Sequence, residues 1–360
     1  MTDGRGLAPQ PGPAGVRLGI IGMGWVGTTR ARTAAADGHV RELHLADIVP
    51  DRAERAAAET RATSFTADYT KLLGAVDAVI ISAAPETTHY PIARDCLLAG
   101  KHVLLEKPMA LTLDEADDLV SLAETSGATF TVGYTQRFQP KFVFIREQFG
   151  RGELGRPTSI MISRHITREL GAKIASRGAL GPVQMEATHD IDLALWWLHP
   201  RRPVRVYAQA ANGIMLDKYA QPDCVWIVIT MEDGVVVAIG ADWSLPTESP
   251  GYSSVMAEVV GTGGAVFSDG SHRDLLVSTT EKGILRPLST MPGEPVGVVY
   301  EGPMEAETKH FIQCAATGAS PVVTPGQARL ALEVALAADL SAQQHLPVSM
   351  QVAHSGAELL

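Results

Sequence analysis

The feature that most constrains the fold is a glycine-rich turn between a predicted strand, residues 16–21, and a predicted helix, residues 28–36. The turn reads Gly22-Met23-Gly24-Trp25-Val26-Gly27. In such a turn the first glycine lets the chain reverse tightly, the second lets a phosphate approach the backbone, and the third lets helix and strand pack closely. The free N–H groups of the helix N-terminus then face the phosphates. Strand, turn and helix in this order predict the first unit of a dinucleotide-binding α/β sheet.

A second predicted strand, residues 43–46, ends at Asp47, which lies 20 residues beyond Gly27. At this position a carboxylate accepts hydrogen bonds from the ribose hydroxyls of an adenosine and repels a 2′-phosphate. Asp47 therefore favours NAD over NADP. Two alternatives stay open. Arg52 lies close enough in the chain to weaken the charge argument, so NADP remains possible. Asp47 can also be an ordinary turn residue before Pro50.

Strands and helices continue to alternate up to residue 133. A predicted helix over 50–59 is followed by a strand over 77–81, and further units follow. Repeated βα units predict a doubly wound parallel sheet. The loop after 77–81 offers small residues against which a flat cofactor ring can lie, namely Ser82, Ala83 and Pro85. His89, at the start of the next helix, either organises a ligand contact or serves in ordinary packing.

A short apolar strand, residues 101–105, ends on Glu106-Lys107-Pro108. The carboxyl ends of the strands are where open α/β sheets bind their ligands. An ammonium group there can polarise or protonate a substrate oxygen, especially if partial desolvation lowers its pKa from about 10.4. The alternative is an ordinary solvated strand end. Gln136 and Arg137 then close a first domain over 16–139.

The second part of the chain, residues 140–360, has a different pattern and is predicted to form a substrate-binding and oligomerisation domain, with packing of its C-terminal segment back on the first domain left open. Its predicted strands cover 159–165, 204–210, 224–230, 235–241 and 254–261, and several are joined by glycine-containing turns. This pattern predicts an α+β domain with a large, mostly antiparallel open sheet. One amphipathic helix over 185–198 places Glu186, His189 and Asp192 at three-residue steps on one side. Such spacing indicates a site or, alternatively, a solvated helix face.

Composition narrows the class of protein. A chain of 360 residues favours two domains. The formal net charge of −10, without a basic run, argues against nucleic acid and anionic membranes as partners. No apolar run approaches the ~20 residues of a membrane span, and residues 1–15 predict a disordered tail. Three widely spaced cysteines are expected to stay reduced, which favours a cytoplasmic location, and no metal site is predicted.

Together these motifs resemble the Gfo/Idh/MocA oxidoreductase family. The resemblance is carried by the glycine turn, by 77–81 with Pro85 and His89, by 99–103 running into Glu106-Lys107-Pro108, and by 189–193. It implies a Rossmann domain, a second domain whose open sheet is buried in a homodimer or homotetramer, and a nicotinamide over the sheet edge. It also implies a polyol, sugar or cyclitol substrate between the domains.

By motif match, Lys107 corresponds to the family's active-site lysine and His189 to its histidine. The family usually has an acid four residues before that histidine, where this chain has Met185. Glu186 is the neighbouring acid, but a helix turns about 100° per residue, so Glu186 can replace it only if the register shifts. His189 is expected to exchange a proton near neutral pH, because its ordinary pKa is about 6.5.

The resemblance and the motifs together give a full set of expected contacts. The expected cofactor contacts are residues 22–27, Asp47, Ser82, Ala83, Pro85, His89, Glu106, Lys107 and Gln136. The expected substrate contacts are Lys107, Arg137, Arg164, His165, His189 and Asp192, with Arg168 as a further candidate. Exposed loop arginines are common, however, so an ordinary surface role is the alternative for the arginines.

The predicted activity is reversible hydride transfer between a secondary alcohol carbon and the nicotinamide. Two alternatives are kept. One is a hydrolase or isomerase that retains NAD and uses it transiently, without net NADH formation. The other is a catalytically silent nucleotide-binding or regulatory protein, for which the methionine at position 185 is the sequence argument.

Overall fold

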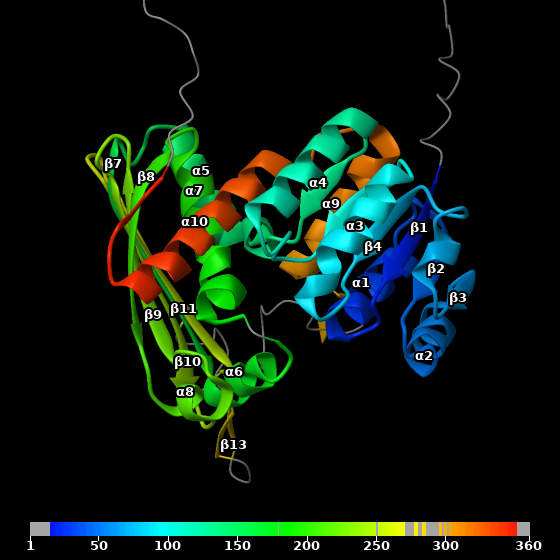
Figure 1. Cartoon of the computed structure of the whole chain (residues 1–360), viewed down its shortest axis with the longest axis horizontal. Coiled ribbons are helices and arrows are strands. Elements are labelled where there is room, and N and C mark those ends of the chain that lie inside the picture. The colour runs from blue at the N-terminus through cyan, green and yellow to red at the C-terminus, as the bar shows by residue number, and fades with distance from the viewer. Residues whose placement is uncertain are drawn as a thin grey trace, which may run out of the picture.

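The computed structural model describes residues 15–178, 180–249, 251–270, 277–279, 283–285, 295–296, 299–300 and 302–350. Two sheets stand at opposite ends of the molecule, with helices around and between them (Figure 1). The predicted N-terminal tail lies outside the described residues except for Gly15. None of the helices in the described ranges is long and apolar enough to cross a membrane.

The first sheet has the strand order β3-β2-β1-β4-β5-β6, and every neighbouring pair is parallel. Its strands are β1 (Val16–Ile21), β2 (Val40–Ala46), β3 (Ser64–Thr66), β4 (Ala78–Ile81), β5 (His102–Leu105) and β6 (Phe130–Val132). This is the order of a dinucleotide-binding Rossmann sheet, in which the order reverses between β1 and β4. The predicted doubly wound fold is confirmed.

Helices and short 3-10 turns connect these strands. The helices are α1 (Trp25–Ala35), α2 (Pro50–Thr60), α3 (His89–Leu98) and α4 (Leu113–Ser126), and the turns are η1 (Tyr69–Leu72), η2 (Glu86–Thr88) and η3 (Thr135–Phe138). The start of α4 follows from its sequence, because the Thr112 hydroxyl accepts a hydrogen bond from the Glu115 N–H at 3.3 Å. The Glu115 carboxylate accepts from the Leu111 N–H at 3.0 Å. Both contacts supply a hydrogen-bond acceptor to an N–H group for which the helix offers no carbonyl oxygen.

The second sheet has the order β12-β11-β7-β10-β9-β8-β17. Its strands are β7 (Pro157–Thr167), β8 (Pro203–Ala211), β9 (Cys224–Met231), β10 (Val236–Leu245), β11 (Ser253–Gly261), β12 (Ala265–Asp269) and β17 (Val348–Ser349). The pair β7–β10 is parallel, and the other pairs are antiparallel. The predicted large, mostly antiparallel sheet is confirmed. Two small hairpins also form, β13 (Val277–Thr279) with β14 (Gly283–Leu285) and β15 (Pro295–Val296) with β16 (Val299–Tyr300).

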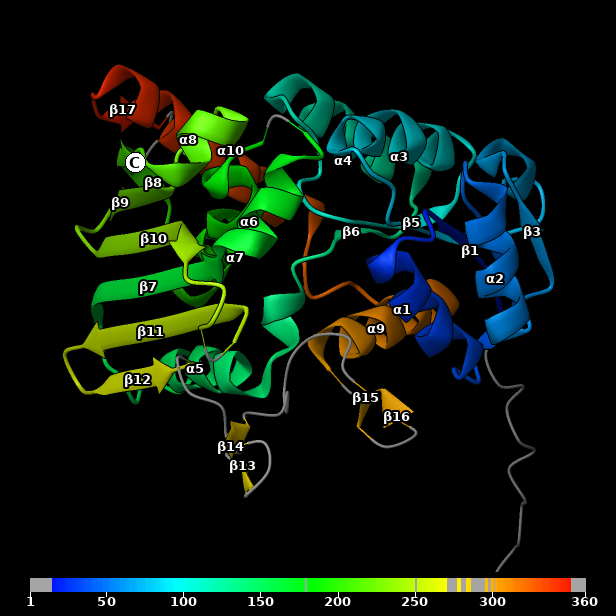
Figure 2. The same cartoon turned by 90° about the horizontal axis from the view of Figure 1, so that it is seen from below.

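Helices cover the face of this sheet that looks toward the first domain (Figure 2). The remaining helical segments are α5 (Pro140–Gly150), α6 (Arg168–Ala175), the π-helical turn η4 (Val183–Ala187), α7 (Thr188–Leu198), α8 (Ile214–Tyr219), α9 (Pro303–Thr317) and α10 (Pro325–Gln344). Side chains on the strands alternate between this buried face and an opposite face. On that opposite face Met161, Trp226 and Phe267 are exposed.

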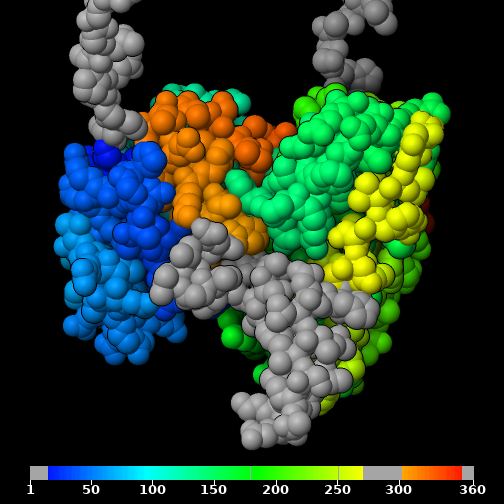
Figure 3. Space-filling model, turned by 180° about the vertical axis from the view of Figure 1, so that it is seen from behind, coloured from blue at the N-terminus to red at the C-terminus, as the bar shows by residue number. Residues whose placement is uncertain are grey.

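The last two helices return to the first domain. Phe311 and Ile312 of α9 share one core with Leu18 and Ile20 of β1. Farther along the chain, the Thr131 hydroxyl of β6 donates to the Val323 carbonyl at 2.9 Å. Figure 3 shows the orange segment that includes α9 between the blue first domain and the green elements of the second. The C-terminal segment therefore packs back on the first domain.

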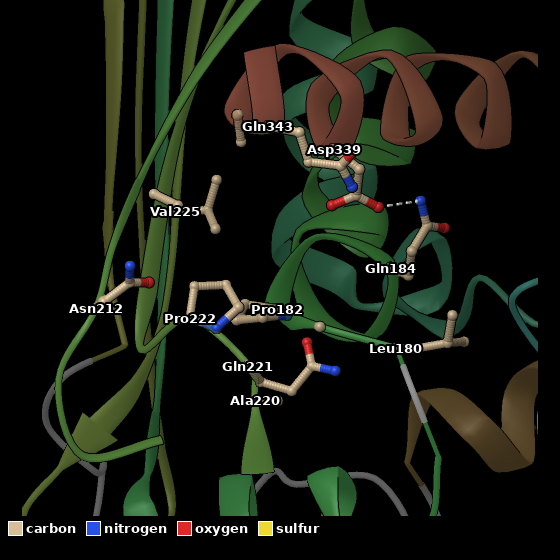
Figure 4. Close-up of a pocket in the computed structure, with 13 residues that line it drawn as sticks. Leu180, Pro182, Gln184, Asn212, Ala220, Gln221, Pro222, Val225, Asp339 and Gln343 are labelled. Carbon is tan, nitrogen blue, oxygen red and sulfur yellow. Dashed lines mark hydrogen bonds between the residues drawn. The ribbon is translucent and has the colours of Figure 1, made fainter. Parts of the chain in front are cut away.

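A small polar cavity of about 380 Å³ lies between α10, the turn before η4 and the β8–β9 edge of the second sheet. Figure 4 shows Asp339 of α10 pointing into it, where Oδ2 accepts a hydrogen bond from the Gln184 amide at 2.9 Å. Burial raises the pKa of Asp339 to about 6. The ionised carboxylate is therefore less favourable in the folded chain than in the unfolded chain.

We expect Asp339→Asn to raise the free energy of unfolding by about 1–2 kcal/mol at pH 7.5 and to leave it nearly unchanged at pH 4. Because the folded-state pKa is raised, the protonated carboxyl stabilises the fold below its unfolded pKa, and this stabilisation is lost as the pH rises through about 6. Asparagine keeps an oxygen for Gln184 without the charge. Urea unfolding at the two pH values measures the difference, and an equal change at both would contradict it.

Candidate active site

A cavity of about 910 Å³ is walled by both domains. Its walls include the glycine turn, the carboxyl end of β5, the segment from η3 into α5, strand β7, the turn η4 and the start of α9. Among the expected site residues, those that line it are Trp25, Val26, Glu106, Lys107, Gln136, Arg164, Glu186 and His189. The structure thus brings together residues that are far apart in the sequence.

The three glycines of the turn have different surroundings. Gly22 has φ +91°, and a Cβ there would lie 2.5 Å from the Ser82 carbonyl oxygen. A Cβ on Gly27 would lie 1.8 Å from the Gly22 oxygen, so this glycine lets α1 pack against the turn. No atom lies within 4 Å of the Cβ position at Gly24. The backbone at Gly24 is therefore open to a ligand, as a dinucleotide phosphate requires.

These differences predict opposite effects for two alanine substitutions. Gly24→Ala should leave thermal stability unchanged and weaken NAD binding about tenfold, because the new methyl group occupies the space of the phosphate. Gly22→Ala should instead destabilise the fold by about 1–3 kcal/mol, because alanine is strained at positive φ and its Cβ meets backbone. Thermal melts and NAD titration by calorimetry check both, and equal losses of stability would contradict the assignment.

Asp47 lies where the sequence places it, at the end of β2. Its Oδ2 accepts from the Met23 N–H at 2.6 Å, and its Oδ1 accepts from the Val49 N–H at 2.8 Å. The carboxylate thus ties the strand end to the glycine turn. The Met23 side chain is buried in the core, so Met23 faces the nucleotide site through its backbone rather than through its side chain. Each oxygen of a carboxylate can accept a second hydrogen bond.

The loop after β4 lies beside the glycine turn. The Ser82 hydroxyl is buried and has no hydrogen-bond partner among the described residues, whereas Ala83 and Pro85 are partly or fully exposed. The ring nitrogens of His89 lie 2.7 Å from the Pro108 carbonyl oxygen and 3.0 Å from that of Ala83. His89 therefore joins this loop to the segment after Lys107, and it is a buried organiser rather than part of the cavity wall. The unpartnered hydroxyl and the open backbone at Gly24 fit a bound dinucleotide.

Lys107 is held by the π-helical turn η4. Its Nζ donates a hydrogen bond to the Met185 carbonyl oxygen at 2.6 Å. Burial lowers the pKa of Lys107, while the carboxylate of Glu186 opposes this shift. Burial also raises the pKa of Glu186. The lysine and the acid therefore titrate closer to neutrality than usual, which suits groups that exchange a proton.

The turn η4 explains how Glu186 reaches the cavity. The sequence predicts a single α-helix over 185–198, in which Glu186 stands in the wrong register to replace the acid that the family has at position 185. The structure instead starts with π-helical hydrogen bonds over Val183–Ala187, which shift the register before α7 begins. Glu186 then lines the cavity, and the Met185 side chain packs beside Trp243 in a separate core.

His189 lines the cavity and packs against the buried Tyr134, with the ring centroids 6.2 Å apart and the rings nearly perpendicular. Its Nδ1 is buried and has no hydrogen-bond partner within the described ranges. Burial, reinforced by the cations Lys107 and Arg164, lowers the pKa of His189 well below 6.5. The sequence gives this ring its ordinary pKa of about 6.5, whereas its surroundings in the fold favour the neutral imidazole, which can accept a proton.

Arg164 of β7 lines the cavity with its guanidinium held from behind. Asp190 accepts from Arg164 Nε at 2.8 Å and from Nη2 at 2.6 Å. His165 and Arg168 do not line the cavity, and one ring nitrogen of His165 is buried without a partner among the described residues. Of the three basic residues on this part of β7 and α6, the structure therefore brings only Arg164 to Lys107 and His189.

Arg137 and Asp192 are paired with each other away from the cavity wall. Arg137 donates from Nη2 to Asp192 Oδ1 at 2.6 Å and from Nε to Oδ2 at 2.8 Å, and Nη1 donates to Gln327 at 2.7 Å. Both side chains are almost completely buried. The predicted shared face of Glu186, His189 and Asp192 is therefore split, because Asp192 faces η3 and α10 while the other two face the cavity.

Behind the cavity, Glu106 belongs to a buried network with Arg30 of α1. Arg30 Nη2 lies 2.5 Å from Glu106 Oε1 and 2.6 Å from Glu307 Oε2, and Nη1 donates to the Thr308 hydroxyl at 2.9 Å. The network joins the glycine-turn helix, the end of β5 and α9. It fixes the carboxyl end of β5, and with it Lys107, against the first helix.

Several wall residues have no counterpart in the sequence prediction. Tyr252, Met304, Glu305 and Lys309 line the cavity from the start of β11 and from α9. No pattern in the sequence places the first turn of α9 beside the Rossmann sheet. Within the described residues, no three His, Cys, Asp or Glu side chains are grouped to hold a metal ion.

A Rossmann sheet with an open glycine turn, next to a cavity that holds a lysine, a neutral histidine and an acid, defines an NAD-binding oxidoreductase. Two family models match the chain in agreement with this class. One, described as an oxidoreductase family with an NAD-binding Rossmann fold, matches residues 16–134. The other, the Gfo/Idh/MocA C-terminal domain, matches residues 142–267. The chain belongs to the Gfo/Idh/MocA oxidoreductase family, which confirms the resemblance.

Individual relatives match from about two thirds of the chain to nearly all of it. The scyllo-inositol 2-dehydrogenase (NAD(+)) of Bacillus subtilis is 26% identical over 347 residues, which cover 94% of this chain and 97% of the relative. The UDP-N-acetylglucosamine 3-dehydrogenase of Acidithiobacillus ferrooxidans is 32% identical over 230 residues, covering 63% and 66%. A crystal structure of scyllo-inositol dehydrogenase from Lactobacillus casei has the same fold, with a TM-score of 0.82 at 22% identity over 93% of this chain and 99% of the other.

Proposed function

We propose that the protein is an NAD-dependent dehydrogenase that transfers a hydride between the nicotinamide and a CH–OH carbon of a cyclitol or related polyol. The observation that carries the proposal is the meeting of Lys107, Glu186 and His189 in one cavity beside the NAD-binding turn. Relatives named as inositol dehydrogenases support the substrate class. The proposal covers both directions of the reaction.

When bound, NAD supplies the hydride acceptor, and the residues of this chain manage the substrate oxygen and its proton. Lys107, anchored on the Met185 carbonyl, hydrogen-bonds that oxygen and stabilises developing negative charge. His189, whose burial favours the neutral imidazole, accepts the hydroxyl proton. Glu186, beside Lys107, takes part in passing the proton out of the cavity. Residues 22–27, Asp47, the 82–85 loop and Gln136 surround the cofactor in this proposal, and Arg164 contacts the substrate.

The position of Glu186 bears on the two alternatives. The methionine at position 185 is the argument for a silent binding protein, but the π-helical turn returns an acid to the cavity. The argument for silence is thereby weakened. A hydrolase or isomerase that retains NAD would use the same groups, so only the fate of the cofactor separates it from a dehydrogenase.

The test is a direct assay of NAD reduction. Purified protein is mixed with NAD or NADP and with inositols, neutral sugars and nucleotide sugars, and absorbance follows the nicotinamide. Steady NADH formation with a cyclitol supports the proposal. Conversion of a substrate without net NADH indicates the cofactor-retaining alternative. Tight NAD binding without conversion of any compound in either direction would overturn the proposal.

We also propose that two copies of the chain associate through the exposed face of the second sheet. One row across this face joins Tyr207, Val228, Ala238, Met161, Glu258 and Phe267 on six neighbouring strands. Four of these six are large exposed apolar side chains. An apolar area that crosses a whole sheet is typical of an interface between subunits. Sedimentation of the wild type and of Met161→Glu tests this, since a dimer or tetramer should become smaller in the variant.

A cytoplasmic location completes the proposal. Cys96, Cys224 and Cys314 are all free thiols, and two of them are buried. Proteins of oxidising compartments usually pair their cysteines in disulfides. Localisation of a tagged copy by cell fractionation tests this, and recovery in a secreted or periplasmic fraction would contradict it.

A further inference from the structure

Glu305 lies in the first turn of α9. Unlike the other buried polar residues Glu307 and Thr308 of that helix, its side chain forms no hydrogen bond with the described residues. Its side chain is buried, with 1% of the residue exposed, and it contributes to the wall of the catalytic cavity. Neither carboxylate oxygen has a hydrogen-bond partner within the described parts of the chain. Buried polar groups nearly always form hydrogen bonds. Burying a charged carboxylate without one costs more free energy than burying a neutral polar group without one.

The rest of α9 shows that partners are available on this helix. Glu307 and Thr308, two and three residues farther on, are both bound by Arg30. Lys309 is one turn from Glu305, at the spacing where a helix usually forms an ion pair, yet it is exposed and is not hydrogen-bonded to Glu305. The described residues thus leave the Glu305 carboxylate without a hydrogen bond although two cations, Arg30 and Lys309, bind or lie on the same helix.

Three other charged residues of the cavity wall have a charged partner close by. Arg164 is neutralised by Asp190, Glu106 by Arg30, and Lys107 has Glu186 beside it. Among the wall acids, Glu305 has two buried carboxylate oxygens that receive no hydrogen bond from the described residues. A carboxylate accepts hydrogen bonds and donates none, so its missing partner must be a donor. An ammonium group is the donor that best compensates a buried negative charge.

We propose that Glu305 is a specificity-determining residue that binds a protonated amino group of the substrate, so that the enzyme prefers an amino-substituted cyclitol or sugar to its neutral counterpart. The inference rests on the proposed dehydrogenase function and adds the substrate class to it. The amino group sits away from the reacting carbon, because Lys107 and His189 occupy the proton-transfer part of the same cavity.

The test compares scyllo-inositol with its 1-amino-1-deoxy analogue, which differs by a single group. For wild type, Glu305→Gln and a control variant, initial rates give kcat/KM for each compound at pH 7. Calorimetry gives the affinity of each compound for the NADH complex, which requires no turnover. Glu124→Gln, at an exposed acid of α4, is the matched control. Thermal melts and NADH affinity show whether each variant is folded and loaded.

We expect the wild type and Glu124→Gln to favour the amine, and Glu305→Gln to lower this preference about tenfold or more while NADH affinity stays unchanged. Equal preference for the two compounds in the wild type would overturn the inference, even if both are oxidised. If Glu305→Gln lowers kcat/KM for both compounds equally and also weakens NADH affinity, the inference is overturned, because Glu305 would then serve the cofactor. If neither compound is oxidised but the amine binds through Glu305, the inference stands and the proposed reaction fails.

Discussion

The Lys107→Met variant is expected to lose about 1,000-fold in kcat for polyol oxidation while binding NAD within about threefold of the wild type. Methionine has a similar length but can neither donate a hydrogen bond to the substrate oxygen nor carry charge. The Met185 carbonyl would also lose its donor, which lies 2.6 Å away in the wild type. Single-turnover rates and NAD titration measure the two effects separately.

The pH profile adds a signature that a purely structural role would not show. Because Lys107 acts as an ammonium group and burial lowers its pKa, we expect the wild-type kcat/KM for oxidation to fall at high pH, with a midpoint below the ordinary pKa of 10.5. The variant should lack this fall. Lys71→Met, at an exposed lysine of η1, is the matched control and should behave as the wild type. Undiminished turnover in Lys107→Met would remove the lysine from the mechanism.

The Arg137→Met variant is expected to lose about 3–5 kcal/mol in the free energy of unfolding. The substitution leaves Asp192 as a buried charge without its two hydrogen bonds, and it also removes a donor from Gln327. Because these contacts join η3 to α7 and α10, their loss should affect the whole described fold rather than one loop. Urea unfolding followed by circular dichroism gives the value.

A double variant separates the free-energy cost of losing the ion pair from the cost of leaving a buried charge without a partner. Arg137→Met with Asp192→Leu removes both partners, so no uncompensated charge remains. We expect it to be more stable than Arg137→Met alone. If the two variants are equally stable, the penalty does not come from Asp192. A near-normal stability of Arg137→Met would instead return Arg137 to the candidate substrate contacts.

The nucleotide half of the site follows closely from sequence because its signals are local. The glycine turn, the strand before it and the helix after it are adjacent in the chain, and Asp47 follows at a spacing that one βα unit sets. The same holds for Lys107, which stands directly after a buried strand. In a parallel sheet all strands end at one edge, so strand order alone brings these residues together.

The second half of the site was decided by tertiary structure. Ionisable residues at helical spacing suggested a site on α7, but the sequence does not show that Asp190 and Asp192 are paired with arginines or that Glu186 turns into the cavity. The π-helical turn that moves Glu186 is accompanied by contacts with Lys107 and α10, which are distant in sequence. The pKa of His189 likewise depends on burial and on cations from β5 and β7.

What the sequence by itself determined is the family, the two kinds of sheet, the NAD-binding turn, and a lysine and a histidine that line one cavity in the structure. Only the tertiary structure decided which charged side chains face the cavity and which form ion pairs with each other. It also placed α9, with Glu305, in the wall of the cavity. The physical reason is that motifs report short-range backbone geometry, whereas charge pairing and burial depend on contacts between segments up to nearly 280 residues apart, such as Arg30 and Thr308.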